Sequence, residues 1–142
     1  MNSPSMLKIL IADDHAIVRK GLREILREGA ADALVEEASN GREAVEKARA
    51  QRWDVVVLDI TMPEMTGLEV LRELNREQPG LPIIMLSMHS DPGYVKTSLK
   101  LGASGYLKKE SAPEELIQAI RTVTTGGKYL SPDLPPSEGP LL

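Results

Sequence analysis

The sequence predicts an α/β domain in which a doubly wound parallel sheet of five strands is covered by five helices. Short apolar segments alternate five times with segments of helical periodicity. This alternation is typical of a parallel sheet with right-handed helical crossovers. Two of the apolar runs, 55–58 and 83–86, contain no polar residue, as expected for central strands buried on both faces. A length of 142 residues suits one domain.

The strands are expected where apolar runs are short, and the second one is polar enough to lie near a sheet edge. They are LKILIAD (7–13), ALVEEAS (33–39), DVVVLD (54–59), PIIMLS (82–87) and SGYLKK (104–109). The helices are expected at HAIVRKGLREILREG (15–29), NGREAVEKARAQ (40–51), TGLEVLRELNREQ (66–78), DPGYVKTSLKLG (91–102) and SAPEELIQAIRTVTTGG (111–127). In the first helix Val18, Leu22 and Ile25 share one face. Asn40 and Ser111 are expected to cap the second and fifth helices.

The chain is expected to divide into a domain over residues 1–127 and a proline-rich tail over 128–142. The tail contains Pro132, Pro135, Pro136 and Pro140, a composition typical of an extended linker that does not pack.

Composition excludes several classes of function. Without cysteine there is no disulfide framework and no cysteine-based metal site. A net charge of −4 argues against nucleic-acid binding by this chain alone, because that requires a basic surface. No apolar run approaches the roughly 20 residues of a membrane span, and the first residues do not resemble a signal peptide. A cytoplasmic location without membrane contact is therefore expected.

Polar residues stand where the expected strands end. Asp13 and Asp14 end the first strand, Asp59 ends the third, Ser87 the fourth and Lys109 the fifth. Ligands of open parallel sheets bind beyond these carboxyl ends, so neighbouring strands would bring the groups together. Two carboxylates at about 5 Å repel by about 3 kcal/mol at an effective dielectric constant of 20. Three acids and one lysine leave about two negative charges, which a divalent cation with oxygen ligands, Mg²⁺, would match.

Such a set of groups suits phosphoryl transfer. A carboxylate beside Mg²⁺, a hydroxyl group and an ammonium group can attack a phosphoryl group and form an aspartyl phosphate. The cation and the lysine stabilise the charge on the transferred oxygens.

The segments ILIADDH, VVVLDITMPEMTGLEVL, IIMLSMH and GASGYLKKE, in this order and spacing, resemble the receiver domain of bacterial two-component response regulators. The resemblance covers residues 7 to about 127 and implies a flavodoxin-like fold with strand order 2-1-3-4-5. It also implies a role for each matching residue: Asp59 as phosphoacceptor, Asp13 and Asp14 as the metal-binding acids, the Thr61 backbone carbonyl as a further metal ligand, Ser87 as the hydroxyl that contacts the phosphoryl group, Lys109 as the lysine of the site and Tyr106 as the switch aromatic.

GYLKKE and TTGGKYLSPDL look most like the NarL/FixJ subfamily, whose members usually continue into a helix-turn-helix DNA-binding domain. That implies a sensor histidine kinase as partner and a transcriptional output through a domain outside this chain. It also implies a homodimer, through the fourth helix, fifth strand and fifth helix (about 91–125) or through the first and fifth helices. The chain would be a phosphoacceptor, at most assisting its own phosphorylation and dephosphorylation, and not a turnover enzyme. Many receivers have a proline after the lysine, joined to it by a cis peptide bond. Here Glu110 follows Lys109, so the sequence does not decide whether this peptide bond is cis or trans.

Other interpretations remain. Asp13 and Asp14 could cap a helix, Asp59 could shape a turn, Ser87 could be a cap, and Tyr106 could be a half-buried strand aromatic. A phosphatase of the haloacid-dehalogenase type would need a second acid where Thr61 stands. A flavin or nucleotide carrier would need a phosphate-binding loop after the first strand. A stand-alone receiver or a pseudo-receiver would act as a protein-interaction module.

Overall fold

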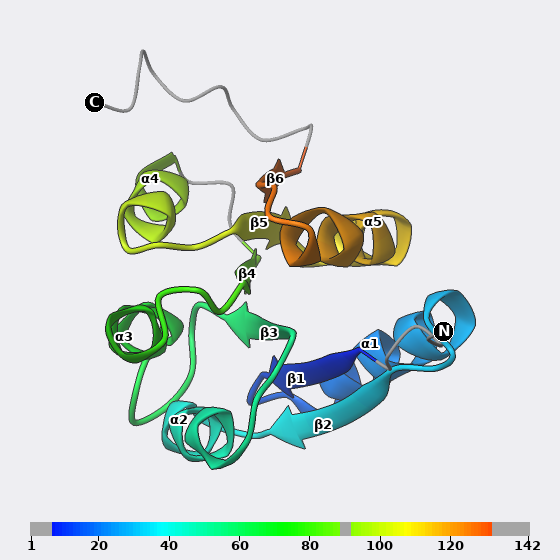
Figure 1. Ribbon diagram of the computed structural model, residues 1–142, viewed down its shortest axis with the longest axis horizontal. Coiled ribbons are helices and arrows are strands. Elements are labelled where there is room, and N and C mark those ends of the chain that lie inside the picture. The colour runs from blue at the N-terminus through cyan, green and yellow to red at the C-terminus, as the bar shows by residue number, and fades with distance from the viewer. Residues whose placement is uncertain (1–6, 89–91, 132–142) are drawn as a thin grey trace.

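Strands and helices alternate along the chain as predicted. The computed structural model describes residues 7–88 and 92–131 (Figure 1). In chain order the elements are β1 (Lys8–Ala12), α1 (Ala16–Gly29), β2 (Leu34–Ala38), α2 (Gly41–Ala50), β3 (Val55–Asp59), α3 (Gly67–Glu77), β4 (Ile83–Ser87), α4 (Pro92–Lys100), β5 (Gly105–Lys108), the 3₁₀ turn η1 (Lys109–Ser111), α5 (Ala112–Thr124) and β6 (Tyr129–Leu130).

The strands form one parallel sheet in the order β2-β1-β3-β4-β5-β6. The predicted order 2-1-3-4-5 is confirmed, and β6 adds a strand beside β5. The register pairs Asp59 with Leu86 and Ser87 with Lys108. The carboxyl ends of β3, β4 and β5 therefore lie at one edge of the sheet, next to the end of β1.

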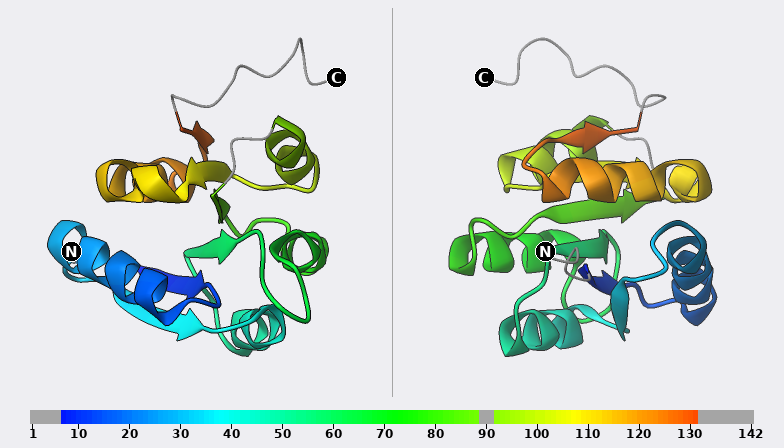
Figure 2. Two further views of the ribbon diagram at one scale, coloured as in Figure 1. Left: turned by 180° about the vertical axis from the view of Figure 1, so that it is seen from behind. Right: turned by 45° about the vertical axis from the view of Figure 1, so that its right-hand side comes forward.

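Helices cover both faces of the sheet (Figures 1 and 2). Helices α2, α3 and α4 lie on one face, and α1 and α5 on the other. Val56 and Leu58 of β3 join the core beneath the first group, whereas Val55 and Val57 join the core beneath α1 and α5. This confirms a central strand buried on both sides. None of the helices in the described chain is long and apolar enough to cross a bilayer.

The helix ends test the predicted caps. Asn40 caps α2, since its side-chain oxygen accepts a hydrogen bond from the Glu43 backbone N–H at 2.8 Å. The prediction for Ser111 is wrong, because its side chain makes no capping hydrogen bond. The turn η1 already carries the chain from β5 into α5, so Ser111 has helical backbone angles and not those of a cap.

The segment after α5 packs more closely than predicted. An unpacked tail was expected from residue 128, but Tyr129–Leu130 form β6 against β5. The Ser131 N–H donates to the Tyr106 carbonyl oxygen at 3.1 Å, and Ser131 is buried. The hydroxyl groups of Tyr129 and Ser131 lie 3.1 and 3.0 Å from the same Glu115 oxygen.

The reason lies in the sheet edge. Without β6, strand β5 would expose unpaired N–H and C=O groups, and even two residues can satisfy some of them. A strand of two residues has no periodicity by which a sequence could reveal it. The packed domain therefore reaches residue 131. The rest of the predicted tail, 132–142, lies outside the described residues, and its extended character stays a prediction.

Glu115→Ala is expected to loosen β6 without unfolding the domain. The change removes the acceptor shared by two hydroxyl groups, and each such hydrogen bond contributes about 1 kcal/mol. Amide hydrogen exchange at Tyr129 and Ser131 should become roughly tenfold to thirtyfold faster. Glu114→Ala, at an exposed neighbouring position, is the control and should leave these amides unchanged. Equal exchange in both variants would mean that Glu115 does not hold the strand.

Candidate functional site

The residues predicted at the strand ends lie together in the structure. Asp13 follows β1, Asp59 ends β3 and Lys109 follows β5. The Lys109 ammonium nitrogen lies 2.9 Å from Asp13 Oδ2 and 3.3 Å from Asp59 Oδ2. Asp13 is fully buried and Asp59 is 3 % exposed. Lys108 points elsewhere, to Glu110 at 3.3 Å, so Lys109 is the lysine of this cluster.

Burial changes the acid–base behaviour of the cluster. Removal from water, together with the nearby Asp13 carboxylate, raises the pKa of Asp59 to about 6, against the opposing pull of Lys109. Burial alone would lower the pKa of Lys109, but hydrogen bonding and charge from the two carboxylates outweigh it and raise that pKa. The lysine is therefore firmly cationic, while the carboxylates hold more negative charge than it can neutralise.

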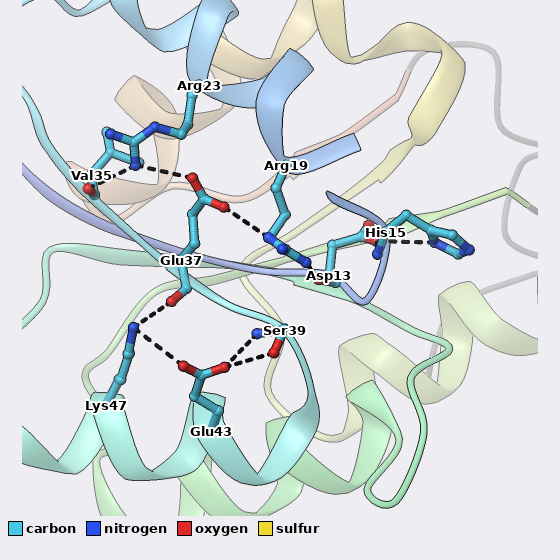
Figure 3. A network of polar contacts seen from close by, with 9 residues as sticks. All are labelled: Asp13, His15, Arg19, Arg23, Val35, Glu37, Ser39, Glu43 and Lys47. Carbon is cyan, nitrogen blue, oxygen red and sulfur yellow. Dashed lines mark hydrogen bonds and ion pairs between the residues drawn. The ribbon is translucent and has the colours of Figure 1, made fainter. Parts of the chain in front are cut away.

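A further acid and a histidine complete the cluster. Ligand atoms of Asp13, Asp14, His15 and Asp59 all lie within 4.8 Å of one another. The His15 ring nitrogen Nδ1 is 3.2 Å from Asp13 Oδ1 and 3.1 Å from Asp14 Oδ1, and the first of these contacts is drawn in Figure 3. His15 is not among the site residues predicted from the sequence, although it directly follows the acid pair.

The cluster fits a divalent cation. Within the described chain, Asp14 Oδ1 is a buried oxygen that accepts no hydrogen bond of good geometry, whereas Asp13 Oδ2 faces the Lys109 ammonium nitrogen at 2.9 Å. Buried acceptors of this kind need a proton donor or a cation. Three carboxylates clustered around a shared centre are the oxygen-rich set that Mg²⁺ prefers. The helix-capping interpretation of the acid pair is less apt, since the Asp13 carboxylate accepts the His15 N–H at 2.8 Å and no side chain caps α1.

The loop after β3 closes one side of the site. The Thr61 N–H donates to Asp59 Oδ1 at 3.3 Å, and Thr61 lines an open pocket together with Asp14, His15, Val18, Asp59, Met88 and Lys109. The loop ends at a capping box, in which Thr66 and Glu69 exchange side-chain to backbone hydrogen bonds at the start of α3. Helix α3 thus begins at a fixed position directly behind the phosphoacceptor candidate.

The two predicted switch residues lie inside the protein. Ser87 ends β4 and is 1 % exposed, and Tyr106 in β5 is fully buried. The half-buried alternative for Tyr106 is wrong. Its ring belongs to the core beneath α2, α3 and α4, which also contains Val95 of α4 and Ala103. A shift of this ring would therefore disturb the packing of α4.

The sequence as a whole matches a known family. Residues 9–121 match the model described as the response regulator receiver domain. Over 129 residues the chain is 40 % identical to the response regulator UvrY and 41 % identical to the transcriptional regulatory protein UhpA, both of Escherichia coli strain K12. Each match covers 91 % of this chain, but only 59 % of UvrY and 64 % of UhpA. The chain therefore spans about 60 % of the length of these relatives.

Solved structures agree with this match. A LuxR-family two-component response regulator from Aurantimonas sp. SI85-9A1 superimposes with a TM-score of 0.86 at 35 % identity. The match covers 92 % of this chain and 93 % of that one.

Proposed function

Because the chain belongs to the response regulator receiver domain family, we propose that it is a phosphorylation-activated switch in which Asp59 accepts a phosphoryl group from a sensor histidine kinase with Mg²⁺ bound. The observation that carries this proposal is the position of the Asp59 carboxylate. It lies at the end of β3, beside the pocket, and 3.3 Å from the Lys109 ammonium nitrogen. Carboxylate oxygens of Asp13 and Asp14 lie within 4.8 Å of it.

The proposed reaction needs little from the protein beyond position and charge. An Asp59 carboxylate oxygen forms a bond to phosphorus as the bond from phosphorus to the donor imidazole breaks, and the imidazole regains a proton from solvent. Bound Mg²⁺ would neutralise charge on the transferred oxygens, with Asp13, Asp14, Asp59 and the Thr61 carbonyl as ligands. Lys109 would pair with one of those oxygens, and Ser87 would donate its hydroxyl hydrogen to another.

Phosphorylation would then act on the face made by α4, β5 and α5. Ser87 would move toward the new phosphoryl oxygens, and Tyr106 would follow it, which would shift α4. The buried position of Tyr106 in the same core as Val95 of α4 supports this route. Since the Ser131 N–H is bonded to the Tyr106 carbonyl, movement of β5 would also reach β6 and Ser131.

The output of the switch is proposed from its relatives. UhpA carries the name transcriptional regulatory protein, and the chain spans only part of its length, so we expect DNA binding through a domain outside these 142 residues. We further propose that the receiver domain covers residues 1–131, and not 1–127, and that it is cytoplasmic. We also propose that it dimerises, through the α4–β5–α5 face or the α1–α5 face. The alternative is a stand-alone or pseudo-receiver that acts as an interaction module.

Asp59→Asn is expected to abolish labelling by acetyl phosphate in the presence of Mg²⁺, because the amide has no nucleophilic oxygen anion. Intact-mass spectrometry measures the covalent phosphoryl group. Asp32→Asn removes one charge from an exposed position and should label like the unsubstituted protein. Labelling that survives in Asp59→Asn would refute the assignment of the acceptor. A protein that never labels would favour the pseudo-receiver.

Asp14→Asn is expected to weaken Mg²⁺ binding at least about tenfold while changing stability little. The Asp14 side chain is 28 % exposed, so it contributes little to the core, whereas it supplies one carboxylate of the proposed ligand set. Isothermal titration calorimetry gives the dissociation constant, and urea unfolding gives the stability. Unchanged affinity would remove Asp14 from the ligand set.

A further inference from the structure

A largely buried arginine contacts the backbone of the acid pair. Arg19 of α1 donates from Nη1 to the Asp13 carbonyl oxygen at 2.6 Å and from Nε to Glu37 Oε1 of β2 at 2.8 Å (Figure 3). Its side chain is only 16 % exposed. One guanidinium thus joins the start of α1, the end of β1 and the second strand.

The contacted carbonyl belongs to the peptide that links Asp13 to Asp14. The Asp13 N–H is already bonded to the Ala38 carbonyl oxygen at 3.1 Å, as the last link between β1 and β2. Fixing the Asp13 carbonyl as well fixes the rotation of the following peptide, and this rotation sets the direction in which the Asp14 side chain leaves the backbone. The Arg19 contact therefore acts on the peptide that sets the relative orientation of the two acids.

The anchor of Arg19 is itself held firmly. The Glu37 carboxylate also contacts Arg23 Nη1 at 3.3 Å, and the Glu37 carbonyl accepts Lys47 Nζ at 2.6 Å. Arg23 also donates a hydrogen bond to the Val35 carbonyl oxygen at 3.1 Å. It therefore shares the Glu37 carboxylate with Arg19 but does not contact the Asp13 carbonyl, which makes it a matched control for Arg19.

We propose that Arg19 is a positioning residue for the metal-binding pair, holding the peptide between Asp13 and Asp14 through the Asp13 carbonyl. This inference rests on the proposed function, because it assumes that the pair binds Mg²⁺. A planar guanidinium suits the task, since it can direct two hydrogen bonds from different edges at fixed angles, whereas a lysine ammonium acts from a single nitrogen. The Glu37 carboxylate offsets the positive charge of Arg19, which reduces the repulsion between Arg19 and a bound cation.

The direction of the change in Mg²⁺ affinity distinguishes a positioning role of Arg19 from a simple effect of its charge. Removing a positive charge near a cation site should by itself strengthen Mg²⁺ binding. Losing the orientation of a ligand should weaken it, by about tenfold for a typical supporting contact. Arg19→Met keeps the aliphatic stem and removes the donors, so we expect the dissociation constant for Mg²⁺ to rise about tenfold.

Calorimetric Mg²⁺ titrations of the unsubstituted protein, Arg19→Met, Arg19→Lys and Arg23→Met test the inference. Arg19→Lys should also bind weakly, because charge alone does not restore two directed bonds, whereas Arg23→Met should stay within about twofold. At saturating Mg²⁺, labelling of Arg19→Met by acetyl phosphate should approach the unsubstituted rate. Unchanged or tighter binding in Arg19→Met, or equal weakening in Arg23→Met, would overturn the positioning role.

Two further results keep the test decisive. If Arg19→Met does not fold, Glu37→Gln can replace it, because this change removes the charge that anchors Arg19 and keeps the shape of the side chain. A smaller rise in the dissociation constant for Mg²⁺ is then expected. No rise would count against the inference. An unsubstituted protein that binds no Mg²⁺ would overturn the proposed function together with this inference. Normal Mg²⁺ binding that is indifferent to Arg19 would overturn the inference alone.

Discussion

Gly67→Ala is expected to destabilise the domain by about 3 kcal/mol or more, because the new methyl group has no space. A Cβ atom at Gly67 would lie 1.9 Å from the Asp59 carbonyl oxygen and 2.8 Å from Ile60 Cα. Both neighbours are backbone atoms, which cannot swing aside as the end of a side chain can. The first turn of α3 is also bonded to this strand end, through the Gly67 N–H and the Ile60 carbonyl at 2.7 Å.

The site should suffer together with the fold, since the displaced backbone carries the phosphoacceptor candidate. Urea unfolding followed by the fluorescence of Trp53, the single tryptophan, measures the loss of stability. Gly21→Ala is the control, because its Cβ would meet nothing within 4 Å and alanine favours a helix by up to about 1 kcal/mol. If Gly67→Ala unfolded at the same urea concentration as the unsubstituted protein, the close approach of α3 to β3 would be wrong.

The main parts of the site could be predicted because they follow from topology. Once the apolar runs are assigned to parallel strands, the residues at their carboxyl ends share one edge. The strand order implied by the family resemblance then brings Asp13, Asp59 and Lys109 together. Their observed separations of 2.9 and 3.3 Å agree with that argument. The roles of these residues in phosphoryl transfer remain predictions that the experiments above address.

The features that sequence reasoning missed depend on contacts between distant segments. Arg19 and Glu37 are ordinary polar residues of an amphipathic helix and a weak strand, and only the packing of α1 beside β2 joins them. The strand at Tyr129–Leu130 exists because the β5 edge offers it hydrogen-bonding partners. Neither a charge pattern nor an apolar period marks such contacts in advance.

Asp59 is expected to make the metal-free protein less stable at neutral pH than an Asp59→Asn variant. Its pKa is raised from the ordinary 3.8 to about 6 in the folded state, chiefly by burial. Between pH 4 and 6 the folded protein therefore binds more protons than the unfolded chain, and stability must fall as the pH rises through this window. A shift of this size corresponds to about 3 kcal/mol lost by pH 7.

Urea unfolding in the presence of a chelator, from pH 4 to 7.5, measures this cost. Asp59→Asn should be more stable than the unsubstituted protein by as much as about 3 kcal/mol at pH 7.5. The difference should shrink steadily toward pH 4, where Asp59 is protonated in the folded state and partly protonated in the unfolded chain. Asp32→Asn, which alters an exposed acid, should show no such pH-dependent gain.

Mg²⁺ should restore more stability to the unsubstituted protein than to Asp59→Asn, because a cation that binds only the folded state offsets the burial of the Asp59 charge and its repulsion from Asp13. If the difference in unfolding free energy between the two proteins stayed constant across the pH range, the pKa of Asp59 would not be raised by folding. The charge argument for a cation at this site would then lose its basis.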